Sequence, residues 1–214
     1  MLSAFVTVCL SLAGLVSSGR TAADTMKAVR VHEFGGVEKL KYEDVPMPRA
    51  EAGQVLVRVK AAGVNPVDWK IRDGNFRMGM KLPMTMGFDV AGVVEEVGEG
   101  VKDFKKGDEV YSYLGVGPGG GYAEFAAIPA KDVAKKPAKA DFKAAGATPL
   151  AALTAWQALF DQAKLAKGQT VLIHGAAGGV GHFAVQFAVW KGATVIATAS
   201  AENAAFVKGL GATT

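Results

Sequence analysis

Residues 169–199, QTVLIHGAAGGVGHFAVQFAVWKGATVIATA, decide the fold of the second half of the chain. The stretch begins with a short apolar strand at 170–174 and passes through a glycine-rich loop into an apolar helix that starts near Gly179. A second strand follows at 194–198. This order of strand, crossover helix and strand is typical of a parallel sheet, so we predict the beginning of a doubly wound α/β domain.

The loop after the first strand carries three glycines in the spacing G-x-x-G-x-x-G. Small residues let the strand turn sharply, let the backbone approach a pyrophosphate and let the helix pack closely on the strand. The helix N-terminus adds free N–H groups and the positive end of its dipole. We therefore predict dinucleotide binding, against the alternative of a purely structural tight turn. The predicted cofactor-binding residues of the loop are Gly175, Ala176, Ala177, Gly178, Gly179, Val180 and Gly181.

The tip of the second strand predicts which dinucleotide is bound. An NAD site usually presents an acidic residue there, whereas this tip ends in Ala199 and Ser200. Glu202 comes two residues later, where the helix dipole also explains an acid. A neutral tip leaves room for a 2′-phosphate, to which Ser200 and Asn203 can donate hydrogen bonds. NADPH is therefore the predicted cofactor, although no Arg or Lys stands directly beside these residues.

The first half of the chain carries several short, Val-rich segments separated by glycine turns. In GQVLVRVKAAGV (53–64) the valines alternate with other residues, which predicts a strand with Val55, Val57 and Val59 on one face. Further strands are predicted at 109–113 and 122–128. Many short strands of this kind indicate a small β-barrel. From about residue 141 the pattern becomes helical, with Pro149 suited to a first turn.

Composition excludes several other classes of protein. The chain has 214 residues, of which half are hydrophobic and 21% are charged, and this argues against disorder. Its formal net charge of +4 comes without an Arg-rich stripe, so nucleic-acid binding is not predicted. Cys9 is the only cysteine, so no intrachain disulfide and no cysteine-based structural zinc site can form.

Residues 1–25 form an extension with an uncharged apolar run at 4–16. The run is too short for a comfortable membrane span and suits a signal peptide, although no Lys or Arg precedes it. Alternatives are translation from Met26 and another targeting segment. A cofactor that is scarce outside cells conflicts with export, so we expect cytoplasmic action with Met26 as the effective start. Export through a cleaved extension is the alternative.

Three stretches resemble the quinone oxidoreductase/zeta-crystallin branch of the medium-chain dehydrogenase/reductase superfamily. They are AAGVNPVDWKIRDG (61–74), GFDVAGVVEEVGEGVKDFKKGDEVY (87–111), and PLAALTAWQAL with GQTVLIHGAAGGVGHFAVQFA (149–159 and 168–188). The resemblance implies a GroES-like catalytic domain at 26–148 and the first part of a Rossmann NADPH-binding domain at 149–214. The sequence stops where a third Rossmann strand is expected, so a truncated Rossmann domain is predicted.

The resemblance also implies chemistry without zinc. Zinc-dependent relatives place a Cys ligand in the segment matching 63–68 and a His-Glu pair at the positions of Phe88 and Asp89. Phe cannot bind a metal, so no metal site is predicted. Without a Lewis acid the acceptor must already be electrophilic, as a quinone or a conjugated enone is. Hydride would pass to it from the nicotinamide, and hydrogen-bond donors would hold the developing oxyanion.

Residue roles follow from the same resemblance. Asn65 is expected beside the nicotinamide as a positioning donor, with Asp68 in the same wall as an orienting group. The alternative to these functional roles is a structural one, in which the two residues form a turn with a helix cap. Thr154 matches a position that contacts the cofactor. An apolar substrate pocket is predicted from Trp69, Phe76 and Tyr113, each of which can instead be ordinary core.

The leading functional prediction is an NADPH-dependent quinone or enone reductase that acts on a small molecule. A 2-enoyl-thioester reductase on the same scaffold is the alternative enzyme. A non-catalytic NADPH-binding protein, as the likeness to zeta-crystallin allows, is the alternative of another class. The family includes dimers, so a homodimer is one expected form of the protein.

Overall fold

The computed structural model describes residues 25–76, 79–115 and 120–213. The predicted extension therefore lies outside the described residues, except for Thr25, which opens the first strand. The first part contains β1 (Thr25–Val31), β2 (Leu40–Pro46), β3 (Gln54–Gly63), α1 (Pro66–Arg72), β4 (Met84–Thr85), β5 (Asp89–Val97), β6 (Glu109–Tyr113), β7 (Phe125–Pro129) and β8 (Val133–Lys135). The second contains α2 (Phe142–Gly146), α3 (Pro149–Trp156), a π-helix (Gln157–Gln162), β9 (Thr170–Ile173), α4 (Gly181–Lys191), β10 (Thr194–Ala197) and α5 (Ala204–Gly209), and short 3-10 turns cover Val37–Lys39, Ala130–Asp132 and Ala201–Asn203.

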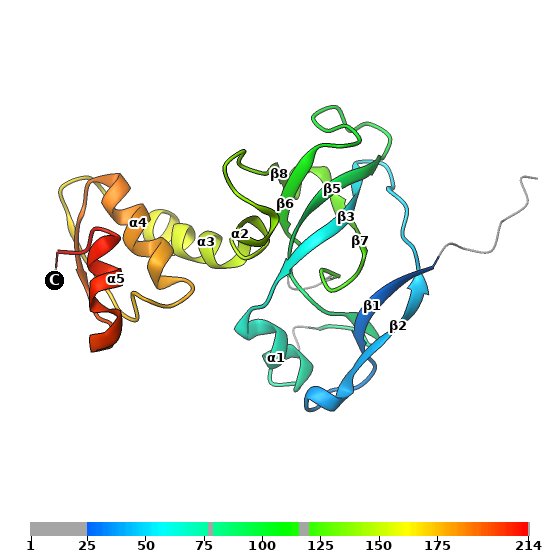
Figure 1. Ribbon diagram of the computed structural model, residues 1–214, viewed down its shortest axis with the longest axis horizontal. Coiled ribbons are helices and arrows are strands. Elements are labelled where there is room, and N and C mark those ends of the chain that lie inside the picture. The colour runs from blue at the N-terminus through cyan, green and yellow to red at the C-terminus, as the bar shows by residue number, and fades with distance from the viewer. Residues whose placement is uncertain (1–24, 77–78, 116–119, 214) are drawn as a thin grey trace, which may run out of the picture.

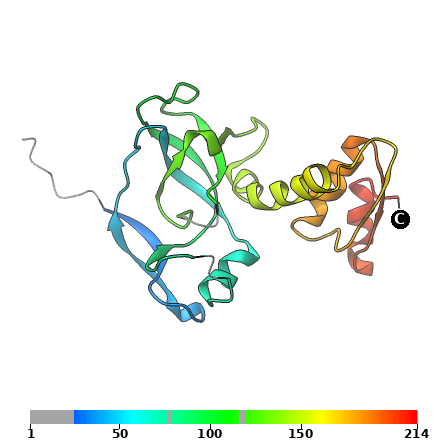
Figure 2. The same cartoon turned by 180° about the vertical axis from the view of Figure 1, so that it is seen from behind.

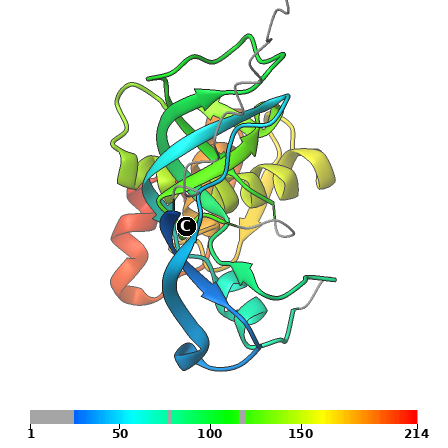
Figure 3. The same cartoon turned by 90° about the vertical axis from the view of Figure 1, so that its right-hand side faces the viewer.

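Strands β1 to β8 form two antiparallel sheets, which we call the barrel (Figure 1). One sheet has the order β2-β1-β4 and the other the order β7-β3-β5-β6-β8. Residues 122–124 tie the sheets together, since the Val29 N–H donates to the Tyr122 carbonyl at 2.8 Å. The prediction of many short strands in this part of the chain is confirmed, and the structure adds that they pair antiparallel. Viewed along the long axis, the β1–β2 hairpin lies below the larger sheet (Figure 3).

The strand predicted at 122–128 is partly wrong, because the chain changes partner within it. Tyr122 and Glu124 bond to β1 through their backbones, and the pairing with β3 covers Phe125–Pro129, with one further bond from the Val59 N–H to the Glu124 carbonyl. The predicted strand 109–113 matches β6. On β3, Val55 and Val57 are buried together in one apolar cluster as predicted. Leu56, which lies between them and outside this cluster, is also buried, so both faces of β3 are covered at this point.

The second part is built on an α/β unit made of β9, α4 and β10. The two strands pair in parallel, with Thr194 opposite Thr170 and Ala197 opposite Ile173, so the predicted strand–helix–strand order is confirmed. Both strands end one residue earlier than predicted, and α4 begins at Gly181 rather than near Gly179. Val195 and Ile173 are buried in the same apolar cluster as Val185 of α4, so the helix covers one face of the pair.

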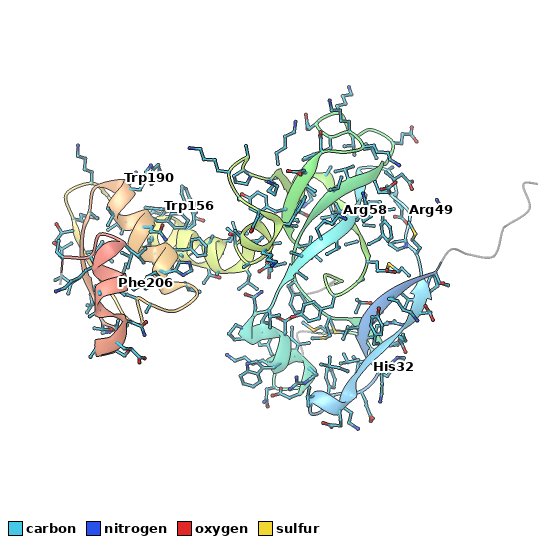
Figure 4. All side chains as sticks on the ribbon, viewed as in Figure 1. His32, Arg49, Arg58, Trp156, Trp190 and Phe206 are labelled. Carbon is cyan, nitrogen blue, oxygen red and sulfur yellow. The ribbon has the colours of Figure 1, made fainter. Side chains whose placement is uncertain are left out.

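Helices α2 and α3 connect the barrel to the α/β unit (Figures 1 and 2). Asp141 caps α2 by accepting the Ala144 N–H at 2.7 Å, and Pro149 occupies the first turn of α3 as predicted. Trp156, at the end of α3, lies beside Trp190 of α4 with ring centroids 6.0 Å apart (Figure 4). This aromatic contact fixes α3 against α4. Within the described ranges, no helix is both long and apolar enough to cross a membrane.

Candidate functional site

Asn65 is held at the junction between β3 and α1. It is the N-cap residue of α1, its backbone is extended, and Pro66 follows in the first turn, where a missing N–H costs nothing. The Asn65 N–H donates to the Asp68 carboxylate at 2.6 Å, which is the reciprocal half of a capping box. Asn65 and Asp68 are 9% and 7% exposed. The helix-cap interpretation therefore describes their local role, and it leaves the side-chain NH2 of Asn65 for another partner.

That partner is Asp89, the first residue of β5. The Asn65 Nδ2 donates to Asp89 Oδ2 at 2.8 Å, and the Leu150 N–H of α3 donates to Asp89 Oδ1 at 2.9 Å. Asp89 is 0% exposed. Burial raises the pKa of Asp89 to about 6, while the hydrogen bonds from Asn65 and Leu150 act in the opposite direction. The site thus contains a buried carboxylate that accepts two hydrogen bonds from two other elements.

Asp68 lies with Tyr122 at a cavity of about 220 Å³ beside Asn65. Among the described residues, Asp68 Oδ1 and the Tyr122 hydroxyl are buried without a hydrogen-bond partner of good geometry. Burial raises the pKa of Asp68, and it raises the pKa of Tyr122 well above its usual value. The Tyr122 hydroxyl therefore keeps its proton, and the neighbouring Asp68 carboxylate is the acceptor to which it can donate.

The residues predicted to line one substrate pocket are divided by the structure. Trp69 lines the cavity of Asn65 and Asp68 and is 47% exposed. Tyr113 lines a different, larger cavity of about 420 Å³ between β6 and α3, together with Trp156. Phe76 follows α1 on the surface and lines neither cavity. Trp69 is therefore the one of the three that lies with Asn65.

The glycine loop runs from β9 to α4 and closes on itself. Gly175 has a φ of 62°, in the left-handed region, and its carbonyl accepts the Gly178 N–H at 2.9 Å. A Cβ on Gly181 would lie 2.2 Å from the Gly175 carbonyl oxygen, so no larger residue fits there. In contrast, a Cβ on Gly179 would meet nothing within 4 Å. The loop is closed toward the strand and open on its outer side, which is the arrangement that a dinucleotide pyrophosphate needs.

The remaining loop residues differ in their surroundings. Ala176 is 0% exposed and its N–H donates to the Thr198 carbonyl at 2.9 Å, so its side chain belongs to the apolar core. Ala177 packs partly against the same core, and Val180 is the N-cap residue of α4. The loop thus exposes backbone without side chains at Gly175, Gly178 and Gly179. The Ala176 side chain instead anchors the loop in the apolar core.

The tip of β10 carries Ser200 and Asn203 in contact with each other. The Asn203 Nδ2 donates to Ser200 Oγ at 2.9 Å, and the Ser200 hydroxyl donates to Glu202 Oε1 at 3.3 Å. A carboxylate therefore stands at this tip, which the sequence interpretation treated as neutral. Thr154, the other predicted cofactor residue, is exposed on α3, and its hydroxyl donates to the Leu150 carbonyl at 2.7 Å.

Two residues of the site escape prediction from the sequence. Asp89 enters the sequence argument only as a position where zinc-dependent relatives have a ligand, yet it bonds to Asn65. Thr198, at the end of β10, accepts the Gly175 N–H on its Oγ1 at 3.2 Å and so fixes the start of the glycine loop. Both are polar residues at a strand boundary, since Asp89 opens β5 and Thr198 directly follows β10.

Nothing in the described ranges points to a metal centre. No three His, Cys, Asp or Glu side chains gather there closely enough to hold an ion. Phe88, at the position of a zinc ligand in zinc-dependent relatives, is 0% exposed and packs in an apolar cluster with Ile71 and Met86.

Comparison with known families identifies the barrel first. The model of the alcohol dehydrogenase GroES-like domain matches residues 51–138, which run from β3 to just past β8. The quinone oxidoreductase of Rattus norvegicus is 45% identical over 184 residues, which are 86% of this chain and 55% of that protein. The structure of the quinone oxidoreductase from Coxiella burnetii matches with a TM-score of 0.81 and 40% identity, covering 89% of this chain and 61% of that one. The CurK enoyl reductase matches with a TM-score of 0.80 and 33% identity, covering 88% of this chain and 58% of that one.

The chain belongs to the medium-chain dehydrogenase/reductase superfamily, in its quinone oxidoreductase/zeta-crystallin-like branch. It spans about 55% of the length of the rat relative that it matches.

Proposed function

We propose that the protein is an NADPH-dependent oxidoreductase that reduces a quinone or a conjugated enone. The observation that carries this proposal is the glycine loop. At position 181 only glycine leaves room for the close approach of the Gly175 carbonyl oxygen, and at Gly179 the loop has open space beside its backbone. When bound, the nicotinamide cofactor supplies a hydride from its C4 to the acceptor. In this proposal residues 26–148 form the substrate-binding domain, and residues 149–214 open the cofactor-binding domain.

The chain's own residues supply binding and orientation. The free N–H groups at the start of α4 and the backbone of Gly175, Gly178 and Gly179 would hold the pyrophosphate. Ser200 and Asn203 would meet the adenosine ribose, with Thr154 along the cofactor. Asn65, whose place is fixed by the cap of α1, would orient the nicotinamide amide.

The acceptor would lie against the cavity lined by Trp69 and Tyr122. Its mostly apolar lining suits a planar conjugated ring. Because Phe88 stands where zinc-dependent relatives bind their metal, the acceptor has to be electrophilic by itself. The names of the rat and Coxiella relatives support a quinone.

A 2-enoyl-thioester reductase is the second candidate, and the likeness to the CurK enoyl reductase favours it. The two differ in acceptor and share the hydride donor. The two candidates are separated by measuring NADPH consumption with a panel of acceptors: 1,2-quinones, 1,4-quinones, enones and enoyl thioesters. Turnover with quinones or enones supports the proposal. Turnover confined to enoyl thioesters contradicts the proposal and favours the second candidate. Tight NADPH binding without turnover also contradicts it and favours a non-catalytic binding protein.

A further inference from the structure

Asp89 joins three elements through one buried carboxylate. It belongs to β5, it accepts the side-chain amide of Asn65 before α1, and it accepts the backbone N–H of Leu150 in the first turn of α3. Space around the carboxylate is tight, because a Cβ on Gly63 would lie 3.0 Å from Asp89 Oδ2 and 2.5 Å from the Gly146 carbonyl oxygen. The two hydrogen bonds are therefore made directly, with little room to replace either by water.

The bond to Leu150 performs the task of a helix cap. The first N–H groups of a helix lack partners within it and are usually met by the N-cap side chain. Thr148, the N-cap residue of α3, turns its hydroxyl to the Ala144 carbonyl instead, at 2.7 Å. Asp89 meets one of these N–H groups from the barrel, and its charge suits the positive end of the α3 dipole. Helix α3 is thereby attached to β5.

The bond to Asn65 fixes the direction of an amide. An ionised carboxylate only accepts hydrogen bonds, so the NH2 end of Asn65 must face Asp89 and the carbonyl end must face away. A neutral amide in place of Asp89 could still accept the Leu150 N–H. It would, however, present its own NH2 group to Asn65, and Asn65 would have to turn over to bring its carbonyl end to that group.

We infer that Asp89 is a positioning residue that sets the orientation of the Asn65 amide and, with the same carboxylate, seats α3 on the barrel. The consequence for the cofactor rests on the proposed function, in which Asn65 orients the nicotinamide. Asp89 itself does not need to touch the cofactor or the acceptor. Its replacement by a neutral amide should therefore change the direction of the Asn65 amide while the Leu150 N–H keeps its acceptor.

Asp89→Asn in the full chain tests this inference, with Asp141→Asn as the matched control. Asp141 also accepts a first-turn N–H, but it does so at α2 and on the surface, and Asn caps as well as Asp. Three quantities are measured at pH 7: the melting temperature, the 15N–1H resonances of the Asn65 side-chain NH2, and the Kd of NADPH from fluorescence. The Asn65 resonances are assigned by their loss in Asn65→Asp.

We expect Asp89→Asn to melt at or above the temperature of the unmodified chain, to shift the Asn65 NH2 resonances, and to weaken NADPH binding about tenfold, the effect of one hydrogen bond. Asp141→Asn should change none of the three. Unchanged Asn65 resonances in Asp89→Asn would overturn the inference, and so would a large fall in melting temperature, which would make Asp89 a purely structural support.

If Asp89→Asn does not fold, the exchanged pair Asn65→Asp with Asp89→Asn decides the matter. In that pair the amide at 89 donates to the carboxylate at 65 and still accepts the Leu150 N–H, so the inference expects folding to return. Failure to fold contradicts it. If the resonances shift and the melting temperature holds while NADPH binds as before, the link between Asp89 and Asn65 stands. The role of Asn65 at the nicotinamide is then refuted.

Discussion

Two glycines of the same loop should respond to the same substitution in opposite ways. A methyl group on Gly181 would stand 2.2 Å from the Gly175 carbonyl oxygen and 2.8 Å from Ala176 Cα, both of which are backbone atoms. The loop can accept Gly181→Ala only by moving away from α4. A methyl group on Gly179 would meet nothing within 4 Å, and its backbone is outside the left-handed region. Gly179→Ala is therefore compatible with the fold.

The expected magnitudes follow from these distances. Overpacking costs about 1–3 kcal/mol, which corresponds to a fall in melting temperature of roughly 2–12 °C for a chain of this size. Gly179→Ala should instead stabilise the chain by about 0.4–1 kcal/mol, since Ala restricts the unfolded chain more than Gly does. Its methyl group would nevertheless occupy the open side of the loop, where the pyrophosphate is proposed to approach. NADPH affinity should therefore fall at least about tenfold while the melting temperature holds or rises.

Thermal melts and fluorescence titration with NADPH on both variants provide the test, with the unmodified chain as reference. A Gly179→Ala variant that binds NADPH with unchanged affinity would show that the open side of the loop is not the pyrophosphate site. A Gly181→Ala variant that melts like the unmodified chain would refute the argument from close approach of Gly175. The paired design matters because loss of binding in Gly181→Ala alone cannot be separated from loss of the fold.

Three further predictions concern the tip of β10, the apolar cavity and the buried acid. Glu202→Gln should raise the affinity for NADPH relative to NADH, and Ser200→Asp should lower it, each by about tenfold, because a carboxylate repels a 2′-phosphate; equal effects on both cofactors would show that this tip is not the selector. Trp69→Ala should raise the KM for an apolar quinone several-fold, while Phe76→Ala, which lines neither cavity, should not; equal losses in both variants would remove Trp69 from the substrate pocket. The pKa of Asp89 is raised to about 6 in the folded chain, so stability from this group is fully present below its ordinary pKa of 3.8 and is lost as pH rises through 6. Denaturant unfolding should therefore show Asp89→Asn gaining about 2 kcal/mol relative to the unmodified chain between pH 4 and pH 7. A pH-independent difference would mean that the Asp89 carboxyl titrates normally.

Elements whose partners are close in sequence could be predicted well. The α/β unit closes within residues 170–197, and its apolar strands, glycine loop and helix follow each other without interruption. Strand β6 was predicted at its observed bounds for a similar reason, since it alternates and has a turn signal on each side. The strand at 122–128 was predicted less well, because its first residues pair with β1, about a hundred residues earlier. Alternation within a segment indicates a strand and does not identify its partner.

The candidate site shows the same limit more clearly. The loop 175–181 and the cap formed by Asn65 and Asp68 are local, so spacing alone predicts them. The link through Asp89 joins residues 24 and 61 positions away, and no periodicity connects them. The bond from Ser200 to Glu202 at the tip of β10 depends on the 3-10 turn at Ala201–Asn203, and the sequence does not show that this turn directs the Glu202 carboxylate back to Ser200.

A buried acid at the first position of an apolar strand is costly, and that cost makes it informative. An ionised Asp89 at neutral pH opposes folding, as its raised pKa indicates, so packing alone does not account for its place in the core. What the carboxylate provides, and a neutral side chain does not, is an acceptor for both the Leu150 N–H and one chosen end of the Asn65 amide. In the sequence DVAGVVEEV, the single charged residue that precedes the buried valines of β5 is therefore where a long-range positioning contact should be sought first.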